Sequence, residues 1–307
     1  MKIVFFGTPE FAVPSLRALL ASGHEVVLVV AQPDRPAGRG MKPRRPAVAE
    51  LALEAGVPLV QPAKIRTGEL HSAVGAAGPD LGVVVAYGRI LPGALLAVPP
   101  HGFLNVHASL LPAWRGAAPI QRAIQAGETR SGVSIMRVDE ELDHGPVFAK
   151  AALEIGPDER APSLAARLAE AGGGLLLEVI EAIQRGEARA SEQDHARASF
   201  APKIDKQEGM VSWNEAARLV YDRFRAFDSW PGSFAPIGGE TVKLTAIRPA
   251  EGSGEPGTIL SMEGEGVVVA LGEGALRLER LQRPGKREAP AADVLRGYGL
   301  RRGEALR

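Results

Sequence analysis

Residues 105–121 read Asn-Val-His-Ala-Ser-Leu-Leu-Pro-Ala-Trp-Arg-Gly-Ala-Ala-Pro-Ile-Gln, and this stretch predicts a strand end followed by a polar loop. A short apolar run at 102–104 leads into Asn105 and His107. Residues two apart in a β-strand point to the same face. Proline and glycine interrupt the stretch 109–119, which therefore predicts a loop at the strand's C-terminal end, where open α/β sheets bind ligands.

The two polar residues of this strand suit acyl-transfer chemistry. Asn105 can donate two hydrogen bonds, and His107 can exchange a proton near neutral pH. Such a pair can stabilise a tetrahedral oxyanion while an amine loses its proton. A histidine at a strand end can also be purely structural. We favour the catalytic interpretation because an amide and an imidazole are costly to bury together without partners.

A loop rich in acids follows the strand predicted at 134–138, which we expect to neighbour the strand of Asn105 and His107. An aspartate before a His-Gly turn is often a turn former, and loop composition alone does not choose among the acids Asp139, Glu140, Glu141 and Asp143. In the same loop, His144 competes with His107 as the base. The histidines predicted to be structural are His24, His71, His101 and His195.

The N-terminal part alternates strands and helices, which predicts a doubly wound, mostly parallel, Rossmann-like α/β sheet. The expected strands are 2–6, 25–31, 57–60, 81–86, 103–107, 134–138 and 147–155, the last antiparallel at an edge. The expected helices are 10–22, 47–55, 66–76, 118–126 and 161–185. The triple glycine 172–174 favours a break in the long last helix. The proline-rich stretch 32–46 is expected to be a long loop.

The pattern changes after Gly186, where a polar, weakly periodic stretch begins. A short helix at 214–227 precedes short strands separated by glycine, which predict a small, OB-like β-barrel. These strands are expected at 241–247, 257–261, 266–270 and 275–281. The expected organisation is a catalytic domain at 1–188, a linker at 189–207 and the barrel domain at 208–307.

Composition narrows the chemistry. The chain has 307 residues, 45% of them hydrophobic, no net charge and no cysteine, which excludes disulfides and cysteine nucleophiles. The turn Gly7-Thr8-Pro9-Glu10 lacks the glycines of a dinucleotide-binding loop, and no ATP or zinc motif occurs, so no metal is expected. Without a signal peptide or an apolar stretch of about 18 residues, we expect a cytoplasmic protein with no membrane partner.

Basic residues gather in two places on this neutral chain. The stretch 34–45 holds five of them against one acid, and residues 276–307 hold nine Lys and Arg against four acids. Two local basic surfaces suggest a polyanion held at chosen places, although a solvated surface face is the alternative interpretation.

Several motifs together resemble the methionyl-tRNA formyltransferase family over nearly the whole chain. They are Asn-Val-His-Ala-Ser-Leu-Leu-Pro at 105–112 with Arg-Gly-Ala-Ala-Pro-Ile at 115–120, Phe-Gly-Thr-Pro-Glu-Phe-Ala at 6–12, Gln-Pro-Asp-Arg-Pro-Ala-Gly-Arg-Gly at 32–40, Ala-Tyr-Gly at 86–88, Ala-Pro-Lys at 201–203 and Trp-Pro-Gly at 230–232. The sequence departs from the family at Glu141, where glycine is common, and at His144, where a small residue is common.

The resemblance implies roles for individual residues. The catalytic trio would be Asn105, His107 and Asp143. The tetrahydrofolate pocket would be formed by Ser109, Leu110, Leu111 and Pro112, with Ala86, Tyr87 and Gly88 nearby. Arg39 and its neighbours Arg35 and Lys42 would meet the acceptor arm of the tRNA, and phosphates farther away are expected to bind the barrel residues Arg283, Lys286 and Arg287.

The expected function is transfer of a formyl group from 10-formyltetrahydrofolate to the α-amine of initiator methionyl-tRNA, by a monomer. One alternative is a folate-dependent formyltransferase acting on an amino sugar nucleotide or on glycinamide ribonucleotide. Small substrates need neither the basic loop nor a basic barrel, which favours the tRNA. Another alternative is an RNA-binding protein that has lost catalysis, but the complete trio favours an enzyme.

Overall fold

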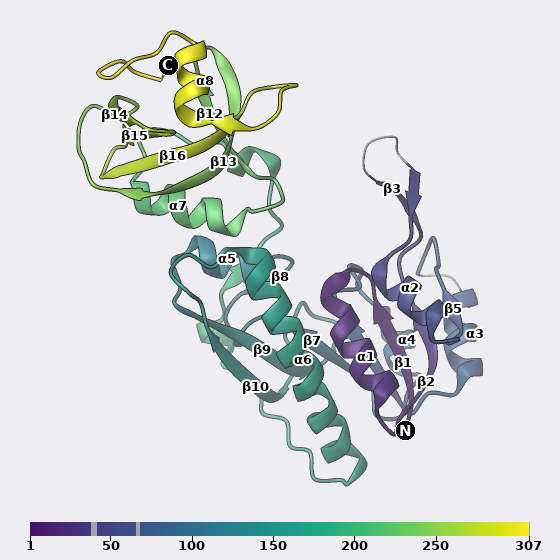
Figure 1. Cartoon of the computed structure of the whole chain (residues 1–307). Helices are drawn as coiled ribbons and strands as arrows, with labels where there is room; N and C mark the ends of the chain where they lie inside the picture. The colour runs from purple at the N-terminus through teal and green to yellow at the C-terminus, as the bar shows by residue number, and fades with distance from the viewer. Residues whose placement is uncertain (38–41, 66–67, 307) are drawn as a thin grey trace. The chain divides into compact units, whose positions relative to one another are not determined.

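The computed structural model of this chain describes residues 1–37, 42–65 and 68–306 (Figure 1). The chain forms two compact units. The first comprises residues 1–119, 130–154 and 163–202, and the second comprises 120–129, 155–162 and 203–307. The chain passes from the first to the second for the last time after Pro202, inside the stretch expected to be a linker.

The first unit is built on a seven-stranded sheet in the order β10-β9-β7-β6-β1-β2-β5. The strands from β7 to β5 are parallel, whereas β9 runs antiparallel to β7 and β10 antiparallel to β9 at the edge. The bounds are β1 (Lys2–Gly7), β2 (Glu25–Val30), β5 (Leu59–Val60), β6 (Leu81–Val85), β7 (Phe103–His107), β9 (Arg130–Arg137) and β10 (Val147–Glu154). The mostly parallel sheet and the antiparallel pairing of its edge strand β10 are as predicted, whereas the antiparallel pairing of β9 with β7 was not predicted.

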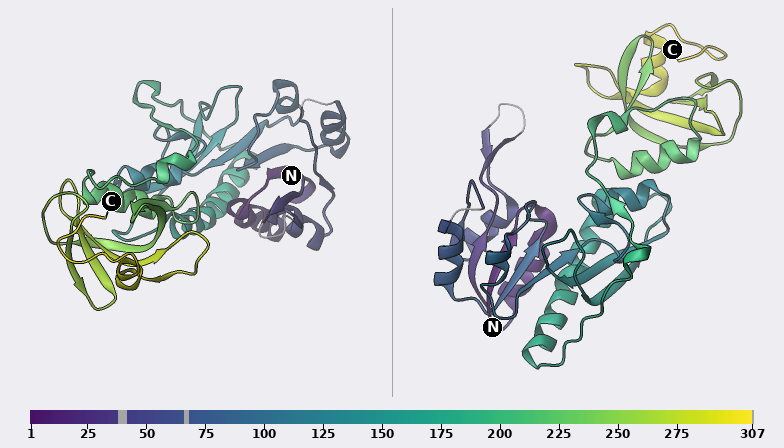
Figure 2. Two further views of the ribbon diagram at one scale, coloured as in Figure 1. Left: turned by 90° about the horizontal axis from the view of Figure 1, so that it is seen from above. Right: turned by 180° about the vertical axis from the view of Figure 1, so that it is seen from behind.

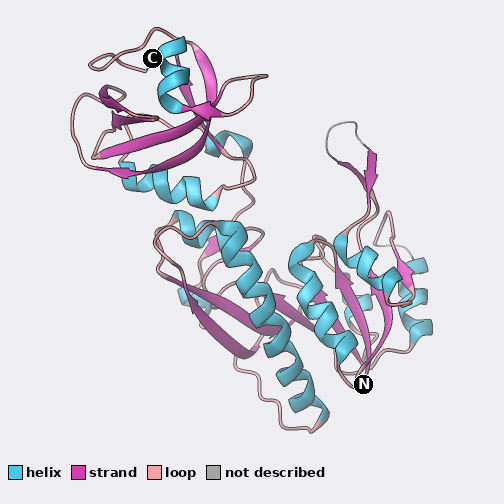
Figure 3. Cartoon of the chain, viewed as in Figure 1, coloured by secondary structure: helices cyan, strands magenta, loops and turns pink. Residues whose placement is uncertain are grey.

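Helices cover both faces of this sheet, as Figure 3 shows by colour. Alternation along β1 sends Ile3 and Phe5 into the core under α1 (Val13–Ala21), α2 (Ala47–Glu54) and α6 (Ala161–Gln184). Val4 and Phe6 pack on the opposite face with α3 (Gly68–Ala77) and α4 (Gly93–Leu96). The predicted doubly wound α/β fold is confirmed. Before α1 stands a 3-10 turn, η1 (Glu10–Ala12), where a continuous helix was predicted.

The long helix α6 is continuous through its three glycines, so the predicted break is wrong. A Cβ atom on Gly172 would lie 2.7 Å from Val106 Cγ1, and one on Gly173 would lie 3.2 Å from the carbonyl oxygen of Pro14. The glycines therefore let α6 approach both β7 and the N-terminus of α1. Close packing outweighs their poor helix propensity here.

The proline-rich stretch 32–46 contains a short hairpin rather than only loop. Strands β3 (Arg35–Ala37) and β4 (Lys42–Arg44) pair antiparallel, with Arg35 opposite Arg44 and Pro36 opposite Pro43. Residues 38–41, and with them the predicted contact residue Arg39, lie outside the described residues. The first two residues of the predicted helix 66–76 also lie outside them.

The end of the first unit is more tightly attached than a linker would be. Ser191 exchanges two backbone hydrogen bonds with Val147 at the start of β10, at 2.8 and 2.9 Å. After the 3-10 turn η2 (His195–Arg197), strand β11 (Phe200–Ala201) pairs in parallel with β8 (Arg115–Gly116). These pairings were not predicted, because the stretch is polar and shows no strand periodicity.

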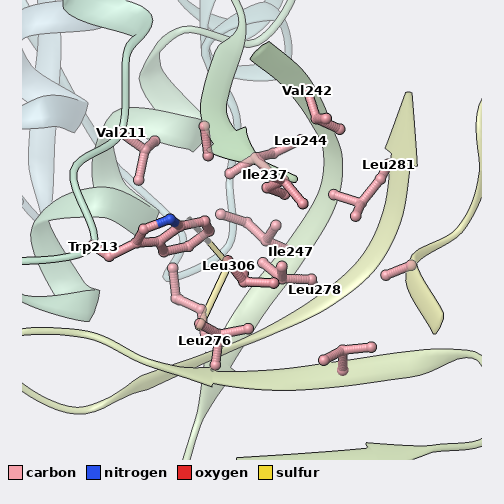
Figure 4. Packing of buried hydrophobic residues seen from close by; sticks show 14 of the residues in the cluster. Val211, Trp213, Ile237, Val242, Leu244, Ile247, Leu276, Leu278, Leu281 and Leu306 are labelled. Carbon is pink, nitrogen blue, oxygen red and sulfur yellow. The ribbon is translucent and has the colours of Figure 1, made fainter. Parts of the chain in front are cut away.

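The second unit is an antiparallel sheet in the order β12-β13-β16-β15-β14, with β17 paired to β16. Figure 2 shows the strands of this unit, coloured green to yellow, from two further sides. Its elements are α5 (Pro119–Gln125, from residue 120), η3 (Lys206–Gly209), α7 (Ala217–Ala226), β12 (Ser233–Ile237), β13 (Glu240–Ala250), β14 (Ile259–Glu263), β15 (Gly266–Ala270), β16 (Ala275–Gln282), β17 (Ala289–Pro290) and α8 (Ala291–Gly297). Apolar side chains pack around Trp213 in its core (Figure 4). The unit is consistent with the predicted small barrel domain; β12, β17 and α8 were not predicted.

A buried ion pair stabilises α7. Asp222 and Arg225 are 2% and 1% exposed, and Arg225 Nη2 donates to Asp222 Oδ1 at 2.5 Å. Arg225 Nη1 also donates to the carbonyl oxygen of Glu159 at 2.9 Å, and Arg218 Nε donates to Asp222 Oδ2 at 2.7 Å. Protein groups thus hold both charges of the pair.

Candidate active site

Strand β7 presents two polar side chains on one face of the sheet. Leu104 and Val106 pack in the core under α1, α2 and α6. Asn105 and His107 alternate with them and therefore point to the opposite face, as the spacing predicted. His107 is 5% exposed. The end of β7 thus carries a buried imidazole with an amide beside it.

Among the four acids of the loop after β9, Asp143 meets these side chains. Its Oδ1 accepts a hydrogen bond from Asn105 Nδ2 at 3.3 Å, and its Oδ2 lies 3.6 Å from His107 Nδ1. Oδ2 also accepts from the backbone N–H of Gly116 at 2.8 Å. Asp143 has a φ of 48°, which L-residues seldom adopt. The amide, the imidazole and the carboxylate therefore form one cluster.

The second ring nitrogen of His107 faces a backbone oxygen. His107 Nε2 lies 3.0 Å from the carbonyl oxygen of Trp114, and because a carbonyl can only accept, this contact requires a proton on Nε2. Trp114 itself has a φ of 61°. Strained backbone of this kind is frequent at functional sites. The imidazole is thus held between the carboxylate of Asp143 and the Trp114 carbonyl.

The competing base, His144, has other partners. Its Nδ1 lies 2.9 Å from Asp139 Oδ2, and its Nε2 lies 3.9 Å from Glu141 Oε2. Its ring stacks on His195 at a centroid distance of 4.1 Å and an interplanar angle of 3°. His144 is therefore paired with Asp139 of its own loop and stacked on His195 of η2.

The loop after β7 divides its predicted folate residues between the protein interior and a pocket. Ser109 is buried, and its hydroxyl donates to the carbonyl oxygen of Ala113 at 2.6 Å. Leu111 is buried with Met136 and Val147. Leu110 and Pro112 instead line a pocket of about 630 Å³ with residues of β10 and of the stretch 191–197.

The predicted folate residues 86–88 follow β6, the strand beside β7. The Tyr87 ring is buried edge-on to Phe6 at 5.3 Å, and this burial raises the pKa of its phenol. Its carbonyl oxygen accepts a hydrogen bond from Gln32 Nε2 at 3.1 Å. Ala86 and Gly88 are exposed and have φ angles of 47° and 81°. Ala86 and Gly88 thus face solvent, whereas the Tyr87 ring lies in the core.

The predicted tRNA contacts belong to different units. Arg35 is exposed in β3 and Lys42 begins β4, both in the first unit. In the second unit, Arg283 donates to both carboxylate oxygens of Glu240, at 3.2 and 3.1 Å. Its guanidinium also lies 4.4 Å from the centre of the Tyr298 ring. The other two predicted contact residues of this unit, Lys286 and Arg287, are exposed.

A buried pair that supports this site, Gln193 and Arg115, was not predicted from the sequence. Gln193 Nε2 donates to the carbonyl oxygens of Asp143 and Gly145, at 3.0 and 2.7 Å. Gln193 Oε1 accepts from Arg115 Nη2 at 2.8 Å, and both side chains are buried. Gln193 follows Asp143 by 50 residues in a polar stretch, so no spacing in the sequence indicates the contact.

Two further observations concern the residues that the structure describes. None of their His, Asp and Glu side chains form a group of three or more suited to a metal ion. Likewise, none of the described helices combines the length and apolar character needed to span a bilayer.

The fold and the site correspond to a known class of enzymes. Residues 1–180 match the family described as "Formyl transferase", and residues 203–299 match "Formyl transferase, C-terminal domain". Together the two matches span both units of the chain.

A full-length relative specifies the family. The chain is 48% identical over 306 residues to the methionyl-tRNA formyltransferase of Thermus thermophilus. The aligned region covers 100% of this chain and 99% of that relative. The chain therefore belongs to the methionyl-tRNA formyltransferase family.

Solved structures of more distant proteins share the fold. The structure of HypX from Aquifex aeolicus in complex with tetrahydrofolic acid has a TM-score of 0.64 at 22% identity, covering 97% of this chain and 47% of that chain. The N-formyltransferase from Helicobacter canadensis, solved with folinic acid and dTDP-3-aminofucose, has a TM-score of 0.68 at 16% identity, covering 92% of this chain and 99% of that chain.

Proposed function

We propose that this protein transfers the formyl group of 10-formyltetrahydrofolate to the α-amine of methionyl-tRNA, with Asn105, His107 and Asp143 as the catalytic residues. The observation that carries the proposal is their convergence at the end of β7, with His107 Nδ1 3.6 Å from Asp143 Oδ2. The full-length relative supports the tRNA acceptor. A fold shared with a protein that binds tetrahydrofolic acid is in keeping with a folate donor.

Asn105 suits the charge that develops during transfer. The amine nitrogen attacks the formyl carbon, a new C–N bond forms, and the bond from that carbon to the folate nitrogen breaks as this nitrogen takes up the proton that the amine loses. The formyl oxygen carries negative charge in between. Asn105 Nδ2 has two hydrogens and gives one to Asp143, so the other is available to that oxygen. One such donor is worth roughly 10²–10³ in rate.

His107 and Asp143 are suited to move the proton. With the ring proton on Nδ1 beside the carboxylate, Nε2 is the nitrogen that can take up the proton of the amine, and the carboxylate stabilises the imidazolium that then forms. Nε2 is occupied by the Trp114 carbonyl, so a substrate atom that bonds to Nε2 must take the place of this oxygen. We propose that substrate binding makes this exchange.

We propose that cationic side chains of both units hold the tRNA. Arg35 and Lys42 flank residues 38–41, and with Arg39 they are proposed to meet the acceptor end. Lys286 and Arg287 are proposed to bind phosphates, together with Arg283. Contacts of this kind position a nucleic acid without reading its sequence.

Incubating the purified protein with 10-formyltetrahydrofolate and different acceptors tests the proposal. We expect formyl-methionyl-tRNA to form, with no formylation of uncharged tRNA, glycinamide ribonucleotide or a dTDP-linked amino sugar. Formylation of either small amine without formylation of methionyl-tRNA would assign the site to another acceptor. Binding of tRNA without any turnover would support the RNA-binding alternative.

A further inference from the structure

The side chain of Gln193 reaches the backbone of the loop that carries Asp143. Gln193 is 7% exposed, and its Nε2 donates one hydrogen bond to the carbonyl oxygen of Asp143 at 3.0 Å and one to that of Gly145 at 2.7 Å. These bonds use both hydrogens of the amide. They act on the turn that holds Asp143, not on its carboxylate.

Arg115 fixes the orientation of this amide. Gln193 Oε1 accepts from Arg115 Nε at 3.2 Å and from Nη2 at 2.8 Å. A flipped amide would place its N–H groups against a guanidinium that only donates, and its oxygen against two carbonyls that only accept. Gln193 therefore has one satisfactory orientation, and in that orientation its hydrogen-bonding capacity is filled.

The turn at Asp143 needs such support. Asp143 has a φ of 48°, a conformation that persists in a non-glycine residue only when its surroundings impose it. A Cβ atom on Gly145 would overlap the carbonyl oxygen of Arg137, so the turn is also tightly packed on that side. The second support of the turn comes from the stretch 191–201, whose Gln193 donates the two hydrogen bonds to it.

The stretch 191–201 also supports the other neighbours of the catalytic side chains. Ser199 Oγ accepts from the N–H of Trp114 at 2.9 Å, and its carbonyl oxygen accepts from the N–H of Arg115 at 2.8 Å. Trp114 supplies the carbonyl that meets His107 Nε2, and Gly116 supplies the N–H that meets Asp143 Oδ2. One stretch therefore braces both sides of the cluster.

We propose that Gln193, oriented by Arg115, is a positioning residue that holds the Asp143 carboxylate in place against Asn105, His107 and the Gly116 N–H. The kinetic consequence rests on the proposed formyl transfer. The geometric consequence does not, because it concerns the protein without substrates.

Gln193→Glu is the most informative variant. It keeps the size of the side chain and an acceptor for Arg115, but it sets an oxygen against the carbonyls of Asp143 and Gly145. We expect kcat to fall by roughly 10- to 100-fold with KM for both substrates changed by less than about threefold. Gln193→Ala should also lower kcat. The matched control is Gln282→Glu in the second unit, where Gln282 Nε2 donates to the carbonyl oxygen of Lys286 at 2.9 Å, and its kcat should match wild type.

A second readout is the NMR signal of the Gly116 amide in protein without substrates. Loss of the hydrogen bond to Asp143 should move this amide proton upfield in both Gln193 variants and leave it unchanged in Gln282→Glu. Lower thermal stability with an unchanged Gly116 signal and unchanged kcat would overturn the proposal and leave Gln193 a purely structural residue. If wild type transfers no formyl group, the proposed function fails, while the Gly116 signal still decides whether Gln193 positions Asp143.

Discussion

The two units bury charged groups in different ways. In the second unit, Asp222 and Arg225 are bonded to each other and to further protein groups. In the first unit, Asn105 keeps a free N–H, and His107 meets Asp143 only at 3.6 Å. Burial of charge is therefore no marker of an active site by itself. What distinguishes the cluster of the first unit is its place at the end of a parallel strand, where ligands bind in open α/β sheets.

The buried pair of the second unit should give the largest effect, and it should be on stability alone. Asp222→Ala leaves the Arg225 guanidinium buried without its carboxylate, so we expect a loss of about 3–5 kcal/mol in the free energy of unfolding. Asp228→Ala is the control. Asp228 Oδ2 lies 3.4 Å from Arg160 Nη1, but the two side chains are 35% and 41% exposed, so this variant should lose less than about 1 kcal/mol in the free energy of unfolding. Urea unfolding measures both. Equal costs would contradict a special role for the buried pair.

The catalytic cluster should show the reverse behaviour. Asn105→Ala and His107→Ala should each lower turnover by roughly 10²–10³, as expected for loss of a group that acts in the transition state. His144→Ala is the control and should change turnover little, because His144 pairs with Asp139. Steady-state kinetics with methionyl-tRNA measures all three. A severe loss in His144→Ala would mean that the base has been chosen wrongly.

Much of this cluster could be predicted from the sequence, because strand periodicity and loop composition are local properties. The alternation around Asn105 and His107 placed both on one face, and the run of acids after β9 included Asp143. Loop composition left four acids open, and the resemblance to the family pointed to Asp143. The structure adds the physical reason, since β9 runs antiparallel to β7 and the loop after β9 turns back toward Asn105. Gln193 was out of reach, because its partners are backbone carbonyls 48 and 50 residues away.

The misses in the fold have similar causes. The glycines of α6 favour a helix break by propensity alone, but Gly172 is needed because Val106 packs closely against it. In the second unit, β12 contains Pro236 and spans only five residues, and α8 spans seven, so neither has a long periodic pattern. Strand β16 spans eight residues with three buried leucines and was predicted within one residue. Elements with a periodic pattern of their own were predicted from the sequence, whereas features that depend on packing against another element were not.

Exposed cations in the second unit should affect binding without affecting chemistry. Lys286→Ala combined with Arg287→Ala should weaken tRNA binding and lower the slope of log K against log salt by roughly 0.9 for each phosphate that these side chains no longer neutralise. Turnover at saturating tRNA should stay near wild type. Arg283→Ala should change the slope less, because Arg283 already pairs with Glu240.

Binding across a salt series, with Arg17→Ala in α1 as a control for removal of one cationic side chain, measures this effect. If the double variant binds tRNA like wild type at every salt concentration, the second unit offers no phosphate contact at these residues.

The smallest effect concerns a bidentate ion pair in the second unit. Arg122 donates to both carboxylate oxygens of Glu208, at 2.5 and 2.9 Å, and this hydrogen bonding lowers the pKa of Glu208. A lowered folded-state pKa stabilises the fold above the unfolded value, and this stabilisation is lost as the pH falls through the folded value. Glu208→Gln should therefore cost roughly 0.5–1 kcal/mol at pH 7.

Urea unfolding of Glu208→Gln and wild type at a series of pH values checks the sign. The difference should be constant down to about pH 5 and shrink below about pH 4.3, the ordinary value for glutamate. A difference that grows on acidification would contradict the assignment to this ion pair.

The central claim is that the Asp143 carboxylate acts with Asn105 and His107 in formyl transfer. Asp143→Asn keeps the shape of the side chain but puts an N–H group where the carboxylate accepts from Asn105 or from the Gly116 N–H. The most direct measurement is the single-turnover rate of formyl-methionyl-tRNA formation by this variant with both substrates saturating. We predict a rate at least about 10²-fold below wild type, with the free energy of unfolding nearly unchanged. A rate within about threefold of wild type would contradict the assignment.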